Sequence, residues 1–437
     1  MKKAQIKKSV SALAMAAVIA VSLFGYGCGA KSASTGSDAG VSGDFTGTAK
    51  GFGGDVSVTL TLTDGAITGC TAEGKDETQG VGSEAIAQMP GKIAESGSIA
   101  VDGVSGATAT STAIKEAAAA ALTAAGLNPD DYKTAVEKDA AAEDSTVDAD
   151  VVVVGAGGAG MTAAITAAAE GKSVVVLESQ SMVGGNSVRA TGGMNAAKTV
   201  YQDENEFGES AGVEKTLKTA AEKYADNETI TALAKTVSEQ WAAYQANPTG
   251  YFDSVELMEL DTMIGGKGIN DPELVETLCA NSADAIDWLD EHGITLHNVS
   301  SFGGASVKRI HRPVNAEGKT VSVGSYMIPL LQENCEKAGV KMMLDTTATE
   351  ILTDANGAAV GVKATGAFGE TVTVNAKAVV LATGGFGANL DMVVKYKPEL
   401  KGFMTTNAPA SRARASRWHR PSALLPWTWT RSRSTHR

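Results

Sequence analysis

Four consecutive valines at positions 151–154 lead directly into the glycine-rich segment 155–160, and this junction constrains the fold more than any other part of the chain. An unbroken β-branched run is typical of a strand that is buried on both faces, as in a parallel sheet. The glycines have the spacing G-x-G-x-x-G, which permits a tight turn, a close approach of backbone amides to a phosphate, and packing of a helix on the strand. With a helix over 160–170 and a second strand over 173–177, the sequence predicts a βαβ unit at the start of an α/β domain.

The expected ligand of this turn is a dinucleotide, because the amino terminus of the helix presents free amides and a positive dipole end to a pyrophosphate. Glu178 stands at the tip of the second predicted strand, where an acid accepts hydrogen bonds from a ribose hydroxyl. The residues predicted to hold the dinucleotide from this unit are Gly155, Gly157, Gly158, Ala159, Gly160 and Glu178.

A smaller domain precedes this unit. Apolar and hydroxyl side chains alternate over 56–63, which is the period of a half-buried strand, and Asp64-Gly65 favours a hairpin turn. The density of alanine predicts a helix over 111–125. Farther along the chain, helical patterns dominate 213–293, with Asp271 and Pro272 as a helix start, and strand-like runs return at 341–344, 360–365 and 378–381. We therefore predict a small α+β domain followed by a Rossmann-like α/β domain.

Charge and cysteine usage exclude several kinds of partner and site. The formal net charge of −13 argues against nucleic acid, because phosphate backbones are bound by basic faces. It leaves room for a small anionic substrate held by a local cationic pocket. Cys70, Cys279 and Cys335 are far apart in sequence and show no spacing of a disulfide framework or of a metal site.

The amino terminus has the pattern of a targeting segment. Four lysines precede an apolar run over 11–24, which is short for a membrane span. The run ends at Gly25-Tyr26-Gly27-Cys28, which resembles a bacterial lipobox. We therefore expect an extracytoplasmic protein that is anchored to the cell membrane by a lipid on Cys28, or secreted if the box is not used. The domain layout predicted for the chain is a lipoprotein signal peptide over 1–28, a flexible tether over 29–42, the small domain over 43–127, a linker over 128–147, the first part of the α/β domain over 148–409, and a divergent tail over 410–437.

Segments downstream of Glu178 identify the dinucleotide. The stretches 183–187 (VGGNS), 190–196 (ATGGMNA), 302–313 (FGGASVKRIHRP) and 379–387 (VVLATGGFG) resemble, in this order, the FAD domain of the fumarate reductase and flavocytochrome c family. The resemblance implies non-covalent FAD with Glu178 on the adenosine ribose. His311 lies in the third stretch, and we interpret it as a structural or flavin-side residue. The further FAD-binding residues that the resemblance implies are Gly185, Asn186, Ser187, Thr191, Gly192, Gly193, Met194, Asn195, Ala382, Thr383 and Gly384.

The small domain carries a second flavin motif. Asp102-Gly103-Val104-Ser105-Gly106-Ala107-Thr108 resembles the motif of FMN-binding domains in which a threonine hydroxyl is esterified to the flavin phosphate. The resemblance implies covalent FMN at Thr108, installed by a separate flavin transferase, with Ser105, Gly106 and Ala107 beside it. The segment precedes the predicted helix, whose free amides can neutralise the phosphodiester. Gln79-Gly80-Val81-Gly82 resembles the glycine turn of the same domains near the flavin.

Together the two resemblances imply an oxidoreductase acting on CH–CH groups. An extracytoplasmic or membrane electron donor would reduce FMN, FMN would reduce FAD, and FAD would deliver a hydride to a small unsaturated carboxylate such as fumarate or urocanate. One alternative is a non-enzymatic electron carrier in which only FMN works. Another is an NAD-dependent oxidoreductase, against which the single G-x-G-x-x-G motif and the segment 192–196 argue.

The tail departs from the resembling family. Seven of the ten arginines and three of the five tryptophans lie in 411–437, and no Asp or Glu follows Glu399. Read one nucleotide earlier, codons permitted for 427–436 continue as x-Asp-x-Asp and then Lys-Ile-Gln-Ile-His-Pro, the family's stretch with its substrate-site histidine. We therefore expect residues from about 410 onward to be read out of frame, which leaves the α/β domain incomplete. The family's catalytic and substrate-binding residues would then be missing, and no proton donor is assigned.

Overall fold

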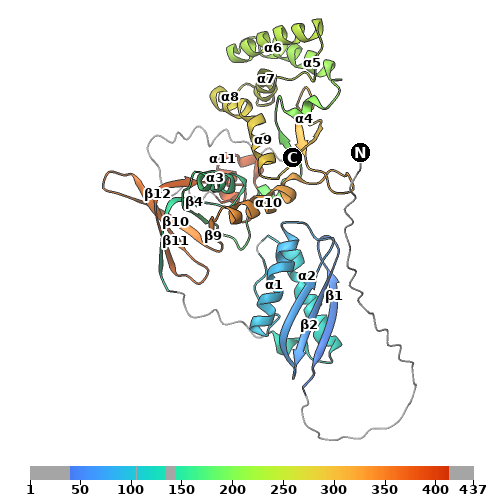
Figure 1. Cartoon of the computed structure of the whole chain (residues 1–437), viewed down its shortest axis with the longest axis vertical. Coiled ribbons are helices and arrows are strands. Elements are labelled where there is room, and N and C mark those ends of the chain that lie inside the picture. The colour runs from blue at the N-terminus through green and yellow to red at the C-terminus, as the bar shows by residue number, and fades with distance from the viewer. Residues whose placement is uncertain (1–39, 105, 134–142, 413–437) are drawn as a thin grey trace, which may run out of the picture. The chain divides into compact units, whose positions relative to one another are not determined.

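The computed structural model describes residues 40–104, 106–133 and 143–412 (Figure 1). The predicted signal peptide with Cys28, most of the predicted tether, Ser105 and most of the predicted out-of-frame tail lie outside these residues. Both domains described below belong to one unit that begins at Val41. None of the helices in the described ranges is long and apolar enough to cross a membrane.

The first domain is an antiparallel sheet of order β1-β2-β3 that packs against two helices. The predicted alternation in β2 is confirmed, because Val56, Val58, Leu60 and Leu62 are at most 2% exposed and the residues between them are not buried. Small side chains let α2 lie close against β1, where a Cβ at Gly47 would stand 2.2 Å from the carbonyl oxygen of Ala117. The elements are β1 (Gly43–Lys50), β2 (Asp55–Thr63), β3 (Ala66–Glu73), α1 (Gly82–Ser96), α2 (Thr108–Ala124) and the 3-10 helix η1 (Pro129–Tyr132).

Two local predictions in this domain can be compared with the structure directly. Asp64 and Gly65 form the predicted hairpin turn between β2 and β3, with φ of 49° and 81°, as the turn that suits twisted strands requires. The predicted alanine-rich helix exists, but α2 begins at Thr108, three residues earlier than expected. Thr108 therefore occupies the first position of the helix.

The second domain is built on a six-stranded sheet of order β10-β11-β12-β4-β5-β9. The strands β12, β4, β5 and β9 are parallel, and β10 and β11 pair antiparallel at one edge. The βαβ unit is therefore confirmed, as are strands at the three later runs. The elements are β4 (Ser145–Val154), α3 (Gly158–Ala169), β5 (Val174–Leu177), α10 (Val323–Lys337), β9 (Lys341–Met343), β10 (Thr347–Thr353), β11 (Ala359–Thr365), β12 (Thr371–Leu381) and α11 (Leu390–Tyr396).

Alternate valines of β4 belong to two different cores, which explains the unbroken β-branched run. Val153 packs with Met161 of α3 and Leu331 of α10. Val152 and Val154 belong to a second cluster with side chains of β10, β11 and β12. Both faces of the strand are thus buried, as a central parallel strand requires.

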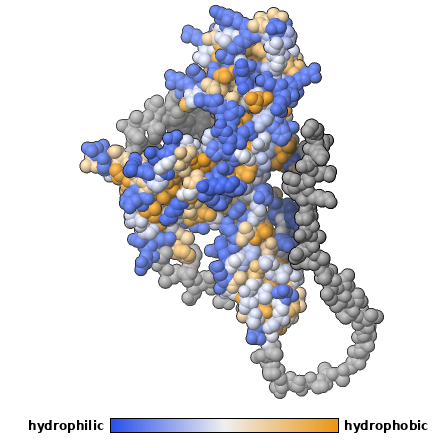
Figure 2. Space-filling view, viewed as in Figure 1, coloured by the Kyte–Doolittle hydropathy of each residue, from blue (hydrophilic) through white to orange (hydrophobic). Residues whose placement is uncertain are grey.

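A helical region is inserted between β5 and α10. Its predicted start at Asp271 is confirmed, because the Asp271 carboxylate accepts a hydrogen bond from the Glu273 amide (3.1 Å) and Pro272 is the first helical residue. Figure 2 shows that the surface over α5 and α6 is mostly hydrophilic. The elements are the 3-10 helix η2 (Ser187–Arg189), β6 (Met194–Asn195), α4 (Val200–Asp203), α5 (Ser210–Lys223), α6 (Glu228–Ala246), α7 (Val255–Gly265), α8 (Pro272–Ala280), α9 (Ser282–Glu291), β7 (Asn298–Ser300) and β8 (Ile310–Arg312).

A buried ion cluster within this region ties the residue that precedes β8 to α7 and to the segment that leads into α7. The Arg309 side chain is 2% exposed and its guanidinium contacts Asp253 Oδ1 (2.6 Å) and Asp261 Oδ2 (2.6 Å). Burial by itself disfavours the charged guanidinium, but the two aspartates outweigh this and raise the pKa of Arg309. The Ser306 amide and hydroxyl complete the shell by donating to Asp261. The segment 306–309 is therefore fixed by charge as well as by packing.

Substituting Arg309→Met is expected to lower the free energy of unfolding by about 3 to 5 kcal/mol, because two buried carboxylates lose their counter-charge. Urea denaturation followed by circular dichroism measures this. The matched control is Lys337→Ala, which removes an exposed ion pair with Glu333 and is expected to cost about 0.5 kcal/mol or less. Equal losses of unfolding free energy in the two variants would contradict the assignment of Arg309 as the counter-charge of the two buried aspartates.

Candidate functional site

The turn between β4 and α3 forms one wall of a cavity of about 400 Å³, which we name the β4–α3 cavity. Gly155 leaves the strand with φ of 106°, a conformation that favours glycine. Gly160 packs against the same turn, since a Cβ there would lie 1.8 Å from the Gly155 carbonyl oxygen. Gly157 lines the cavity, and a Cβ built there would make only ordinary contacts, at 3.7 Å to Ser187 Oγ and 3.8 Å to the Gly184 carbonyl oxygen. The first and third glycines thus shape the turn, and the second leaves room for a ligand.

Glu178 lies at the carboxyl end of β5 on the edge of this cavity. Its side chain accepts hydrogen bonds from the backbone amides of Ala156 (2.9 Å) and Gln180 (3.0 Å). Burial raises the pKa of Glu178 in spite of these donors. A carboxylate offers about four acceptor positions, so Glu178 retains capacity for a hydroxyl of a ligand.

The opposite wall is assembled from segments far apart in sequence. The Asn186 side chain donates to Asn407 Oδ1 (2.7 Å) and accepts from the Ala408 amide (2.6 Å). Ser411 donates to the Gly385 carbonyl oxygen (3.1 Å). Residues 407–411 are therefore held against the turn that follows β12, and Ala408, Ala410 and Ser411 line the cavity.

Most residues predicted for FAD meet in the β4–α3 cavity. Ser187 supports the turn by accepting a hydrogen bond from the Gly158 amide (3.2 Å). Sequence reasoning did not single out Ser179 and Leu381, which adjoin predicted residues, or the segment 346–348, which approaches through tertiary packing. The predicted residues that line the cavity are Gly155, Gly157, Gly158, Ala159, Glu178, Gly185, Asn186, Ser187, Ala382, Thr383 and Gly384.

Gly192, Gly193, Met194 and Asn195 do not line this cavity. Met194 and Asn195 form β6 and pair with β8, and a Cβ at Gly193 would lie 2.4 Å from the His311 carbonyl oxygen. Strand pairing therefore accounts for this glycine-rich segment in the structure. Thr191, just before it, lines a different pocket, described below.

His311 is fully buried and both of its ring nitrogens are engaged. Nδ1 lies 2.8 Å from the Arg309 carbonyl oxygen and Nε2 lies 2.7 Å from Thr199 Oγ1. A carbonyl only accepts, so Nδ1 carries the proton and Nε2 accepts from the threonine hydroxyl. Burial lowers the pKa of His311, which agrees with this neutral form. These contacts support the structural interpretation of His311.

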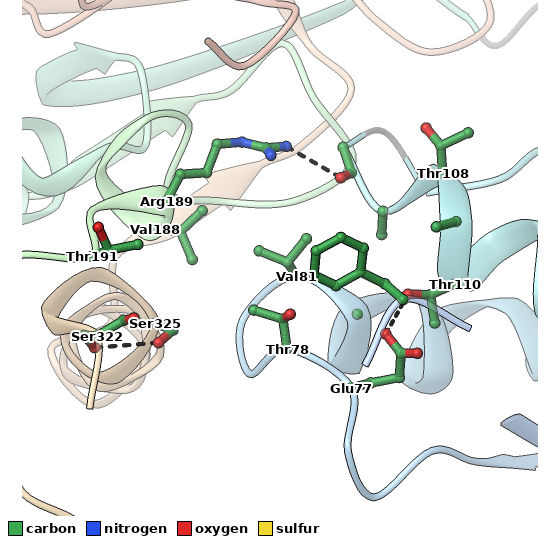
Figure 3. A pocket seen from close by; sticks show the side chains of 15 residues that line it. Glu77, Thr78, Val81, Thr108, Thr110, Val188, Arg189, Thr191, Ser322 and Ser325 are labelled. Atoms are coloured by element: carbon green, nitrogen blue, oxygen red, sulfur yellow. Dashed lines mark hydrogen bonds between the residues drawn. The ribbon is translucent and has the colours of Figure 1, made fainter. Parts of the chain in front are cut away.

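A second cavity of about 190 Å³ lies at the amino terminus of α2, and we name it the α2 pocket (Figure 3). The predicted residues Gly106, Ala107 and Thr108 line it, and Thr108 is exposed at the first position of the 17-residue helix. The N-cap residue Ala107 makes no side-chain cap hydrogen bond, so among the described residues this helix end has no cap and can meet an anion. Val81 and Gly82 of the predicted glycine turn also line the pocket.

Glu77 is a pocket residue that sequence reasoning missed. It is 8% exposed and accepts hydrogen bonds from Thr110 Oγ1 (2.6 Å) and the Gly53 amide (3.1 Å), so it ties the β1–β2 turn to α2. Figure 3 shows its side chain pointing at Thr110. The second domain contributes the rest of the wall through Val188, Arg189, Thr191, Ser322 and Ser325.

Both cavities fit flavin phosphates on their own geometry. Each is placed where a glycine-containing turn meets the first residues of a helix. In the β4–α3 cavity, the turn residue Gly157 and the acceptor Glu178, which both line it, suit the pyrophosphate and ribose of FAD. In the α2 pocket, the exposed Thr108 hydroxyl and the uncapped helix suit a phosphate ester of FMN.

Comparison with protein families gives two matches. Residues 150–251 and 240–420 match the family described as FAD binding domain, and residues 51–123 match the family described as FMN-binding domain. The first match includes the residues that line the β4–α3 cavity, and the second includes those lining residues of the α2 pocket that belong to the first domain.

Several characterised proteins are similar in sequence. An NADH:acrylate oxidoreductase of Vibrio harveyi is 33% identical over 392 residues, which is 84% of this chain and 38% of that protein. A urocanate reductase of Eggerthella lenta is 35% identical over 385 residues, covering 86% and 55% of the two chains. A fumarate reductase (cytochrome) of Shewanella frigidimarina is 37% identical over 262 residues, covering 60% and 38%. This chain thus spans between about two fifths and just over half of the length of these relatives.

Among solved structures, the open conformation of a flavocytochrome c3 fumarate reductase aligns with a TM-score of 0.47 and 29% identity. The alignment covers 62% of this chain and 39% of that one.

Gly157→Val is expected to weaken FAD binding about 10- to 100-fold, the value of one or two charge-assisted hydrogen bonds, because the side chain would occupy the space before the helix amides. The fold is expected to persist, since φ at this position is −81°. FAD titration and circular dichroism measure the two effects. Gly208→Val, at an exposed position with nothing within 4 Å, is the control. Unchanged FAD affinity in the Gly157 variant would contradict the assignment of the cavity.

Proposed function

This chain belongs to the FAD-binding flavoprotein family of fumarate reductase type, and on that premise we propose that its two flavins form an electron relay from FMN to FAD, which in the protein read in frame delivers electrons to the double bond of a small enoate. The observation that carries the proposal is the presence of two phosphate cradles in one chain, at the amino termini of α2 and α3. The relatives named fumarate, urocanate and acrylate reductases support an unsaturated carboxylate as the substrate class.

The residues of the chain would bind and orient the two flavins. Gly157 would present its amide to the pyrophosphate of FAD, Gly158 would share its amide between Ser187 and the pyrophosphate, and Glu178 would accept from the ribose. Bound FAD supplies the hydride that an activated double bond accepts. Residues 407–411, held by Asn186, would close one side of the cavity and keep water away from the cofactor.

We propose that FMN is held covalently through Thr108. Its hydroxyl is on an exposed side chain at the start of α2, so a flavin transferase can reach it. The negative phosphodiester formed there would lie against the positive end of the helix dipole, which stabilises the product by up to about 1 kcal/mol at an exposed site. The transferase is therefore a required partner.

The proposed location is outside the cytoplasm, with a lipid on Cys28 and a membrane or extracytoplasmic electron donor. The support is the basic and apolar start of the sequence and its lipobox-like end. We further propose that this chain does not itself reduce an enoate, because its sequence from about residue 410 departs from the resembling family where that family has its substrate-site histidine.

Co-expression with a flavin transferase is expected to add the mass of one FMN to the chain, retained after denaturation. Thr108→Val removes the nucleophilic hydroxyl and is expected to abolish the added mass completely. Thr112→Val changes an exposed threonine one turn along the same helix and is expected to leave it intact. Intact-protein mass spectrometry is the measurement. Undiminished flavinylation of the Thr108 variant would refute the proposed attachment site.

A further inference from the structure

The turn η2 contributes to both cavities within three residues. Ser187 lines the β4–α3 cavity and accepts from the Gly158 amide, while Val188 and Arg189 line the α2 pocket. The turn is tightly held from behind by α10, where a Cβ at Gly324 would lie 2.1 Å from the Ser187 carbonyl oxygen. Because η2 lines both cavities and is held in place by α10, it fixes the positions of the two proposed flavin sites relative to each other.

Arg189 is the cation of the α2 pocket. Of the fifteen residues that line the pocket, Glu77 and Arg189 carry charge, and the Glu77 carboxylate already accepts from Thr110 and Gly53. Arg189 Nη2 donates to the Gly106 carbonyl oxygen (3.2 Å), two residues before Thr108, and its Nε is buried with no hydrogen-bond partner among the residues that the structure describes. Figure 3 shows the guanidinium extending from η2 toward the segment that leads into α2. A buried donor of this kind costs free energy unless a ligand satisfies it.

The contacts around Arg189 also join the two domains. Gln88 of α1 donates to the Ser181 carbonyl oxygen (3.2 Å), and Met182, 6% exposed, packs in the core cluster of the first domain. The segment 181–189 is thus one of the parts of the second domain that meet the first domain at this pocket. Its one cation contacts Gly106, two residues before the residue proposed to carry the phosphate.

Resting on the proposed attachment of FMN, we propose that Arg189 is a positioning residue that binds the FMN phosphodiester from the second domain. A guanidinium can donate to two oxygens of one phosphate, and its attraction for the negative ester adds to that of the helix amides. Attachment of FMN to Thr108 then strengthens the docking of the first domain on η2. The second domain in this way holds the FMN-binding domain more firmly when FMN is attached to Thr108.

The test is amide hydrogen exchange of the full chain, saturated with FAD, with and without covalent FMN. Loading is expected to slow exchange over 181–190 about tenfold in the unsubstituted protein, the effect of one charge-assisted hydrogen bond. In Arg189→Gln the loading effect is expected to disappear, and in Arg189→Lys part of it is expected to remain, because a point charge replaces the bidentate fork. Lys172→Gln removes the same charge from an exposed turn outside the pocket and is expected to keep the full loading effect.

Intact mass of each sample separates the two proposals. A chain that carries no FMN refutes the proposed function at Thr108. A loaded chain whose loading effect is the same in Arg189→Gln as in the unsubstituted protein, or is absent from the unsubstituted protein, refutes the role of Arg189. If Arg189→Gln does not fold, Arg189→Lys decides the question. A slowing of amide exchange by FMN that is as large in Arg189→Lys as in the unsubstituted protein overturns the phosphodiester contact. A smaller slowing supports it.

Discussion

The attraction between a phosphate and the free amides at the start of a helix is the interaction on which the rest of this structure depends. It requires a strand or loop that ends in a glycine turn and a helix whose N-cap residue carries no hydrogen-bonding side chain, and this holds for Ala107 before α2 and for Gly157 before α3. Other residues of the two cavities hold the starts of these two helices and the turns near them in place. Glu178 and Glu77 brace the turns through backbone amides, and η2 stands between the two sites.

Features set by short-range chemistry could be predicted from the sequence. The valines at 151–154, the three glycines of the turn and Glu178 follow one another along the chain, and the structure brings them together as expected. The Asp64-Gly65 hairpin and the Asp271 helix start likewise depend on local backbone preferences. The residues of the FMN motif that the structure describes stand at a helix start for the same reason.

Features set by tertiary contact could not be predicted in this way. No local pattern brings Asn407 to Asn186 across more than 200 residues, or Arg189 to Gly106 of another domain. The segment 192–195 is predicted to contact the flavin, and its pairing could not be foreseen: Met194 and Asn195 pair with β8, and a Cβ at Gly193 would lie 2.4 Å from the His311 carbonyl oxygen. Arg309 lies in the stretch 302–313, but its burial between two aspartates depends on residues far from it in sequence.

The central claim is that one chain holds two flavins by their phosphates at two helix starts. A crystal structure of the full chain carrying both flavins tests it most directly. The account predicts the FAD pyrophosphate within hydrogen-bonding distance of the amides of Gly157 and Gly158, and an FMN phosphate bonded to Thr108 at the start of α2. Electron density for FAD away from the 155–160 turn, or for FMN away from α2, would contradict it.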